Sequence, residues 1–260
     1  MITTDIGPEG VAASLVLVFV AIGLSLRQGL GIERTIAWAA TRALVQLVAV
    51  GYALTIVLDE DAPTALAILW VVLMVLIAAV TVRARAPDVP GVFQIALLAL
   101  GAAAVATLGV LFGLGVFPFE PVAIVPLAGM MVGNSMAATV SAARRVVAEL
   151  ADHRLEVEAR LALGQPWNLA SRPYVRSAVR VALTTQIEST KTVGLIALPG
   201  AMTGLILAGV DPLDAVLVQI AIMYLILGAA ATTTAIVGNG VARRLFTDDH
   251  RLVPVARSIA

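Results

Sequence analysis

The sequence predicts an all-α, polytopic transmembrane helical bundle with about seven spans, its N-terminus outside and its C-terminus in the cytoplasm. Of the 260 residues, 60% are hydrophobic and only 13% are charged, whereas a soluble domain carries about 25% charged residues. Apolar runs recur that reach the length of about 20 residues needed to cross a bilayer. We therefore expect one transmembrane domain over residues 1–260.

The seven apolar runs give the expected spans in order. They lie at about 11–26, 36–58, 62–82, 92–116, 122–143, 193–210 and 215–238. The chain before the sixth run is polar, so this span begins anywhere between Val181 and Val193. The first ten residues carry Asp5 and Glu9 but no basic residue. A cleaved signal peptide needs a positively charged start, so we expect the first run to remain as a span.

The orientation is predicted from the sorting of basic residues among the connections. The connections after the second, fourth and sixth runs contain no Lys or Arg, and all 17 basic residues lie in the other connections, in the C-terminal tail or within spans. Because positively charged loops stay in the cytoplasm, this sorting predicts an outside N-terminus and a cytoplasmic C-terminus.

The largest polar segment is an inner one, at about 144–180, and its first part has a helical pattern. Arg145 with Glu149, and Glu156 with Arg160, have the i,i+4 spacing of ion pairs on a helix. A glycine followed closely by a proline ends helices, and we expect Gly164 and Pro166 to end this one.

A second inner helix is expected to start near Ser171 and Pro173, and it places Arg172, Arg176 and Arg180 on one face. This arginine face has two interpretations. It contacts anionic lipid headgroups, at about 1 kcal/mol for each arginine near the surface, or it docks onto an acidic partner.

Several chemistries are excluded by missing residues. The chain has no cysteine, which excludes thiolate metal ligands and cysteine nucleophiles. Its only lysine, Lys191, follows Thr190 rather than glycine, so no Walker A loop is present. His153 and His250 lie in inner polar segments and not at membrane depth. We expect no catalytic residue, no enzymatic activity and no cofactor bound by this chain.

Arg42 and Gln46 are polar residues within the second run. Polar groups at membrane depth are costly and usually face the protein interior or a water-filled cavity. Arg42 either extends to the inner headgroups or pairs with a neighbouring helix, or it lines a transport path together with Gln46, one turn further along.

Two proline-associated GxxxG segments occur in the fifth and sixth runs. Pro126 precedes Gly129 and Gly133, a pattern that favours close helix packing, and Asn134 then requires a partner inside the protein. Four methionines lie near the expected crossing of these segments and either bind a soft or borderline metal ion or fill gaps in an apolar core: Met130, Met131, Met136 and Met202. The metal, if any, is unknown.

Glu188 and Lys191 precede the sixth run at i,i+3 spacing. If the span begins at Val193, the two residues pair at the inner interface. If it begins near Val181, they lie deep in the membrane and Glu188 becomes a candidate cation ligand.

The inner segment also carries a short motif, Glu158-Ala159-Arg160 followed by Gly164. It resembles the start of the cytoplasmic EAA loop of ABC-transporter permeases, Glu-Ala-Ala-xxx-Gly, a helix that fits a cleft on the ATPase subunit. Arg160 departs from that pattern at the third position. Tyr174 and Arg176 depart from its continuation.

Four segments taken together resemble the iron-export ABC permease family, the Fet-type B subunit, formerly catalogued as uncharacterised membrane proteins. The likeness covers about residues 36–223 in matching order, with Ala201 departing where a methionine is expected. The segments are 42–52 (RALVQLVAVGY), 129–136 (GMMVGNSM), 156–164 (EVEARLALG) and 191–204 (KTVGLIALPGAMTG).

The resemblance implies a permease subunit of the inner (plasma) membrane that exports iron or a related substrate. It implies a separate ATPase subunit that uses ATP, a homodimer of permeases within the lipid bilayer, and no nucleic-acid partner. Plant relatives are linked to aluminium tolerance and to a nucleotide sugar, so iron is the family's default. The residues that the resemblance assigns to ATPase coupling are Glu156, Glu158, Ala159, Arg160 and Gly164.

Two other classes of function stay open at this point. In the first, the chain would be a stand-alone secondary transporter or channel, with Arg42 and Glu188 in an ion path. Alternatively, it is a scaffold protein, in which the intramembrane polar residues only hold helices together.

Overall fold

The computed structural model describes residues 7–59, 61–195, 198–247, 249 and 251–253. Asp5 and His250, which were named above, lie outside the described residues, and so do Glu60 of the connection after the second run and Arg257 of the C-terminal tail. So do residues 196–197 of the expected sixth span. The described part is helical and contains no β-strand, only an isolated bridge between Phe246 and Leu252. The predicted all-α class is confirmed.

The chain divides into two compact units. One consists of Met1–Pro63 with Leu207–Gly209, and the other of Thr64–Ile206 with Val210–Ala260. The expectation of one domain over residues 1–260 stays a prediction.

The first unit is a helical hairpin of α1 (Pro8–Gln28) and α2 (Glu33–Val57). Gly29 and Gly31 form the turn with φ of 63° and 68°, a left-handed conformation that costs glycine little. Across the turn, the hydroxyl of Ser25 donates a 2.7 Å hydrogen bond to Glu33 Oε1. Ser25 is buried, so this bond satisfies a polar group within the hairpin.

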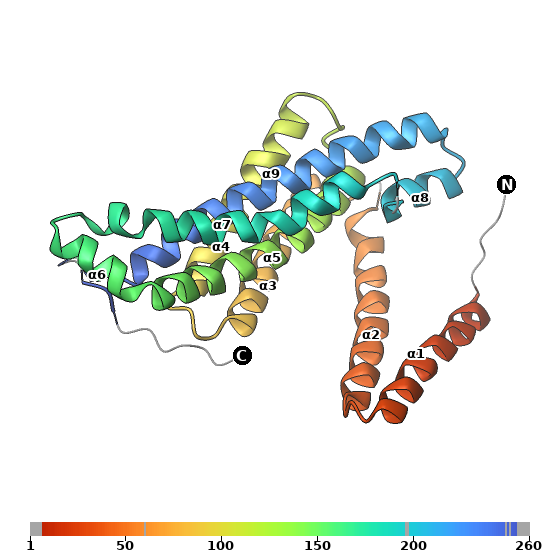
Figure 1. Ribbon diagram of the computed structural model, residues 1–260. Helices are drawn as coiled ribbons and strands as arrows, with labels where there is room; N and C mark the ends of the chain where they lie inside the picture. The colour runs from red at the N-terminus through yellow and green to blue at the C-terminus, as the bar shows by residue number, and fades with distance from the viewer. Residues whose placement is uncertain (1–6, 60, 196–197, 248, 250, 254–260) are drawn as a thin grey trace. The chain divides into compact units, whose positions relative to one another are not determined.

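The second unit contains the remaining helices (Figure 1) and holds the two buried apolar clusters. The helices are α3 (Thr64–Arg85), α4 (Val92–Gly113), α5 (Pro121–Asp152), α6 (Arg154–Ala162), α7 (Trp167–Thr192), α8 (Gly200–Leu207) and α9 (Pro212–Arg244). Small residues let these helices approach closely. A Cβ added at Gly238 of α9 would lie 2.6 Å from Val179 Cγ2 of α7.

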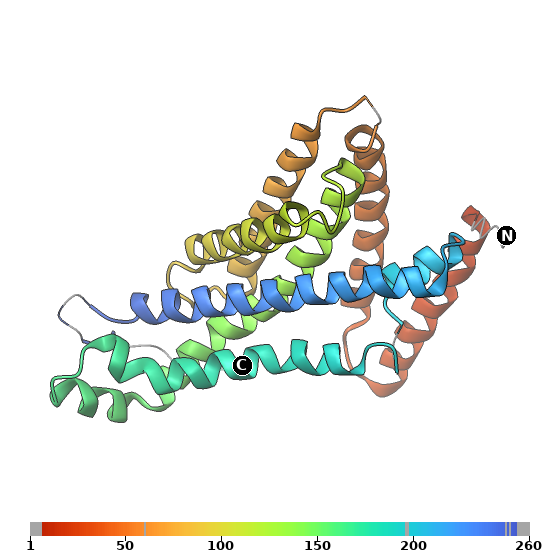
Figure 2. The same cartoon turned by 90° about the horizontal axis from the view of Figure 1, so that it is seen from above.

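The long helices α5, α7 and α9 lie side by side, and α7 runs antiparallel to both neighbours (Figures 1 and 2). At the C-terminal end of α5, Glu149 accepts a hydrogen bond from Ser177. Further along α7, Gln186 lines a cavity together with Asn134 of α5 and Gln219 of α9. Residue numbers thus rise along α7 as they fall along α5 and α9. It follows that α5 and α9 run parallel to each other.

Six helices of the described chain are long and apolar enough to cross a membrane: α1, α2, α3, α4, α5 and α9. They confirm a polytopic membrane bundle, but the predicted sixth span over 193–210 is wrong as a single helix. The eight-residue α8 is the only helix that falls within this range among the described residues. The physical reason is that polar α7 already extends to Thr192, and Pro199 with Gly200 starts a separate helix.

The inner segment also differs from its prediction in detail. The helix α5 continues to Asp152, and α7 begins at Trp167 rather than near Ser171. Gly164, with φ of 83°, ends the α6 segment as expected. The orientation of the chain across the membrane stays a prediction.

Candidate substrate path

A cavity of about 350 Å³, lined by both apolar and polar side chains, lies within the second unit, among α5, α7, α9 and the start of α8. Proline and glycine at the start of α8 leave its backbone accessible beside the cavity. The side chains that give the cavity its chemistry are Met130, Asn134, Gln186, Ser189, Gln219 and Met223.

Gln219 is the most buried polar residue of this cavity, at 4% exposed. Its Oε1 accepts a 3.3 Å hydrogen bond from the backbone N–H of Met202. Met202 is in the first turn of α8, where N–H groups have no acceptor within their own helix. Gln219 therefore acts as a tertiary cap that fixes α8 to α9.

Asn134 lies across the cavity from Gln219, on α5. Its amide nitrogen donates a 2.7 Å hydrogen bond to the carbonyl of Met130. The Oδ1 atom accepts no hydrogen bond from the described residues, so it is available to a ligand or to water.

The lining of the cavity carries no formal charge. It offers amide oxygens, one hydroxyl and two thioethers, which are oxygen and sulfur atoms able to contact a cation or a polar solute without binding it tightly. Among the described residues, no group of three His, Cys, Asp or Glu side chains is placed to hold a metal ion.

The sequence-derived candidates are distributed unevenly about this cavity. Met130 and Asn134 line it, and Met202 contributes its backbone N–H. Met131 is fully buried in an apolar cluster, and Met136 packs against both clusters. Arg42 and Gln46 belong to α2 of the first unit and are exposed there, so their role as path residues stays a prediction.

Four cavity residues were missed by the sequence reasoning: Gln186, Ser189, Gln219 and Met223. Gln219 had a usable signal, because it is an amide within an apolar run. Gln186 and Ser189 had none, since their segment reads as polar connection and not as a helix at membrane depth.

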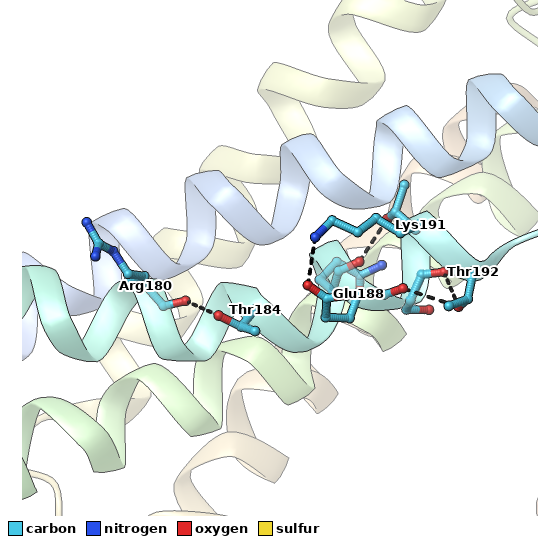
Figure 3. Close-up of polar contacts among 8 residues, drawn as sticks. Arg180, Thr184, Glu188, Lys191 and Thr192 are labelled. Carbon is cyan, nitrogen blue, oxygen red and sulfur yellow. Dashed lines mark hydrogen bonds and ion pairs between the residues drawn. The ribbon is translucent and has the colours of Figure 1, made fainter.

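Glu188 and Lys191 lie on another face of α7, and they form the expected i,i+3 pair (Figure 3). Lys191 Nζ is 2.8 Å from Glu188 Oε1, and the two side chains are 64% and 57% exposed. Neither residue lines the cavity. Their assignment to a substrate path stays a prediction.

The inner helix α6 carries the candidate coupling residues, and its ion pairs differ from the predicted ones. Arg154 Nε donates a 2.6 Å bond to Glu158 Oε1, and Glu156 accepts a 2.8 Å hydrogen bond from the hydroxyl of Tyr174. Arg160 lies over the Tyr174 ring at 5.9 Å. Ala159 is exposed and Val157 is buried beneath it.

The predicted pairing of Glu156 with Arg160 is therefore wrong, because both side chains contact Tyr174 instead. The pairing of Arg145 with Glu149 is wrong as well. Glu149 instead accepts a bond from Ser177 and lies 3.8 Å from His153 Nδ1. In place of the two predicted pairs, Tyr174 bonds α7 to Glu156 of α6 and Ser177 bonds α7 to Glu149 of α5, and these contacts hold α6 and α5 against α7.

The Tyr174 hydroxyl shows the effect of this packing. Burial and the hydrogen bond to the Glu156 carboxylate raise the pKa of Tyr174 above its ordinary value. The phenol stays protonated at neutral pH and remains the donor in this bond.

The chain matches one protein family over nearly its whole length. The model of the Uncharacterised protein family UPF0014 matches residues 9–246. The probable iron export permease protein FetB of Escherichia coli K12 is 34% identical over 249 residues, which is 96% of each chain. These matches confirm the resemblance inferred from the four sequence segments.

Plant proteins are similar to the chain as well. The UPF0014 membrane protein STAR2 of Oryza sativa subsp. japonica is 38% identical over 226 residues, 85% of this chain and 78% of its own. ALUMINUM SENSITIVE 3 of Arabidopsis thaliana is 36% identical over 227 residues, 86% of this chain and 81% of its own. No solved structure matches the chain.

Proposed function

The chain belongs to the UPF0014 family of membrane proteins, and on this premise we propose that it is the membrane-spanning permease subunit of an ABC transporter. ATP is hydrolysed on a separate subunit, this chain binds no cofactor, and two permeases form a homodimer in the inner (plasma) membrane. The cargo is iron or a related metal, in keeping with the name of the relative FetB.

The observation that carries the ATPase coupling is the inner hairpin of α6 and α7. Its exposed side presents Ala159, within the motif that resembles the EAA loop, while Val157 anchors the opposite side in the core. Gly164 closes the hairpin in a left-handed conformation. A short helix held this firmly can transmit the movement of a docked ATPase into α5 and α7.

Two substitutions test the coupling. Glu158→Lys places a like charge beside Arg154, and Gly164→Pro is incompatible with a φ of 83° because proline fixes φ near −65°. We expect each to abolish co-purification of the ATPase subunit while membrane insertion is retained. Val105→Ala, at an exposed position of α4 away from this hairpin, is the control. Co-purification that survives both changes contradicts the coupling assignment.

The metal cargo is tested separately. We expect the cellular iron content to rise when the chain is removed, and iron to stimulate ATP hydrolysis by the reconstituted complex. A flat response to iron, with stimulation by another solute, contradicts iron as the cargo and leaves the permease assignment in place.

A stand-alone secondary transporter or channel is the second candidate, and the ion pair of Glu188 with Lys191 favours it. Charged groups near a transport path serve ion coupling in such proteins. A gene for a Walker-type ATPase next to the gene for this chain supports the ABC transporter, and its absence favours the secondary transporter.

A further inference from the structure

A groove of about 560 Å³ lies between α7 and the C-terminal part of α9, apart from the candidate substrate path. Both helices belong to the second unit, and they lie side by side (Figures 1 and 2). Arg172, Arg176 and Arg180 of α7 line the groove at intervals of one helical turn. The arginine face predicted from the sequence is therefore one wall of a groove, which we call the arginine groove.

The positive charge of the arginine groove has no counter-charge in its lining. No Asp or Glu lines it, and none lines a smaller hollow of about 350 Å³ that shares Arg172 and Arg176 on the α6 side. The guanidinium groups of the three arginines form no ion pair and no hydrogen bond with any described residue. Like charges four residues apart destabilise a helix, so an anion bound among them would relieve this repulsion.

The turn of the α1–α2 hairpin does not offer the missing anion. Glu33 is the acidic residue at that turn, and its carboxylate already accepts the hydrogen bond from Ser25. Arg27 and Arg34, which flank the turn in the sequence, carry further positive charge. An anionic ligand from outside the chain fits the charge of the arginine groove better than any part of the hairpin.

The level of the arginine groove in the membrane follows from α9, which carries no charged residue between Asp214 and Arg243. At 1.5 Å per residue, a hydrocarbon core about 30 Å thick takes up about 20 residues. Counted from Asp214, the core ends near Thr234, where the apolar run of α9 gives way to threonines. Ala235 and Asn239, which line the groove, come directly after this point and lie in the headgroup layer.

The arginine groove also has an apolar floor. Val175, Val179 and Ala235 line it, and α7 meets α9 closely there, since a Cβ added at Gly238 would lie 2.6 Å from Val179 Cγ2. Trp167 lines the groove as well, and tryptophan is enriched at the membrane interface. A protein that docks from the aqueous side accounts for the arginines but not for an apolar floor at headgroup depth. A phospholipid accounts for both.

We propose that the arginine groove binds an anionic phospholipid, with the phosphate among the three arginines and the start of the acyl chains on the apolar floor. The bound lipid joins α7 to α9 next to the α6–α7 hairpin. This inference goes beyond the proposed function. It relies on the membrane location of the chain but not on an ATPase, a homodimer or a metal cargo.

Lipid binding is measured by native mass spectrometry of the full-length protein in detergent, titrated with phosphatidylglycerol or with phosphatidylcholine. The test variant combines Arg172→Gln with Arg176→Gln, which removes two charges from the arginine groove and keeps polar side chains there. The matched control combines Arg83→Gln with Arg85→Gln, which removes the same charge from exposed positions at the end of α3.

We expect the wild type to bind phosphatidylglycerol at least about tenfold more tightly than phosphatidylcholine. One arginine near an anionic membrane surface is equivalent to about a fivefold change in affinity. The test variant should therefore bind phosphatidylglycerol about 25-fold more weakly, and the control should bind it as the wild type does. Equal binding of both lipids by the wild type, or an equal loss in test variant and control, overturns the proposal.

Trp167 provides a second measurement at the arginine groove itself. In a background with Trp38→Phe and Trp70→Phe, it is the only one left of the three tryptophans. Phosphatidylglycerol brominated on its acyl chains near the headgroup should quench Trp167 fluorescence more strongly than phosphatidylcholine brominated at the same positions. Adding Arg172→Gln and Arg176→Gln should remove this difference. Equal quenching by the two lipids in the background protein contradicts an anionic lipid in the groove.

Two other ligands give distinguishable outcomes. If inorganic phosphate displaces phosphatidylglycerol at an equal concentration, the arginine groove is a site for free phosphate and the lipid assignment is overturned. If the test variant loses a co-purifying ATPase subunit while its lipid binding is unchanged, the arginines dock onto an acidic partner, which overturns the lipid assignment as well. Because both lipid measurements use this chain alone, failure of the coupling proposal leaves them unchanged.

Discussion

Tyr174 and Gln219 are residues whose single hydrogen bonds join elements far apart in the sequence. Tyr174 of α7 bonds to Glu156 of α6, and Gln219 of α9 bonds to the backbone of α8. Both residues are buried, and each of the two hydrogen bonds joins two different helices. Their loss should affect one junction each and leave the rest of the fold in place.

Removing the Tyr174 hydroxyl should destabilise the α6–α7 junction in a pH-dependent way. A hydrogen bond of this kind contributes about 1 kcal/mol, which for a chain of this size lowers Tm by about 2–4 °C in Tyr174→Phe. Because the folded-state pKa of Tyr174 is raised, the contribution is complete below the ordinary tyrosine pKa of about 10 and is lost as pH rises through the folded-state value.

Thermal unfolding of the detergent-solubilised protein followed from pH 7 to 11 checks this. The gap in Tm between wild type and Tyr174→Phe should stay constant at neutral pH and close at the alkaline end. A gap that widens as pH rises is the opposite of what the hydrogen bond requires.

Replacing Gln219 should free α8 from α9. In Gln219→Leu the Met202 N–H is left without an acceptor at a partly buried site, where such a loss costs about 1 kcal/mol. We expect faster hydrogen exchange of the α8 amides and little change at α3 and α4. Ile220→Leu, at the exposed neighbouring position, serves as the control. Unchanged exchange of α8 in Gln219→Leu argues against the cap.

At the scale of elements, glycines on α9 set how closely its neighbours approach. At Gly238 an added Cβ meets Val179 of α7 at 2.6 Å, whereas at Gly228 it meets Thr107 of α4 at an ordinary 3.6 Å. Two glycines on one helix therefore offer a matched comparison of steric crowding against helix propensity.

Gly238→Ala should destabilise the second unit, and Gly228→Ala should not. Overpacking costs about 1–3 kcal/mol, while alanine in place of a helical glycine gains up to about 1 kcal/mol. We expect a lowered Tm for Gly238→Ala and an equal or higher Tm for Gly228→Ala, with the same helix content by circular dichroism. If both variants unfold at the same temperature, α7 and α9 are not in this close contact.

The elements also show what the sequence could predict. Five of the six membrane-crossing helices are close to their predicted ranges, because apolar runs of span length leave few alternatives. The largest error concerns α7, whose sequence TTQIESTKT reads as connection. It is helical beside α5 and α9 because tertiary packing of its alanine face outweighs its polarity. The hydrophobic periodicity of a single sequence does not indicate which neighbouring helix will pack against the alanine face of α7.

The candidate site was predictable only in part for the same reason. Met130 and Asn134 were found because they interrupt an apolar run, but Gln186 and Ser189 depend on the position of α7. Met131 and Met136 have thioether side chains that could bind a metal ion, but Met131 lies in an apolar cluster and Met136 packs against two of them. Sequence spacing could not separate the two outcomes, since adjacent helical positions point in different directions.

At the scale of the whole molecule, the register of three helices restricts the path of the chain through the membrane. Because α5 and α9 run parallel, the segment between them has to return to the side from which α5 starts. The helices α7 and α8, separated by residues 193–199, are the described helices available for this return after α6. Counting this return as one crossing, we expect seven crossings, whereas six helices of the described residues meet the criteria for a span.

Labelling from outside intact cells tests this topology and its predicted orientation together. Single cysteines at Asp61 and Leu213 should react with an impermeant maleimide in intact cells, whereas those at Arg85 and Leu163 should react only after permeabilisation. The reason is that the connections holding Asp61 and Leu213 lack basic residues and the others contain them. If all four cysteines react in the inverse pattern, the orientation is opposite to the predicted one and the number of crossings is unchanged. If Leu163 and Leu213 react from the same side, α7 and α8 do not traverse the membrane.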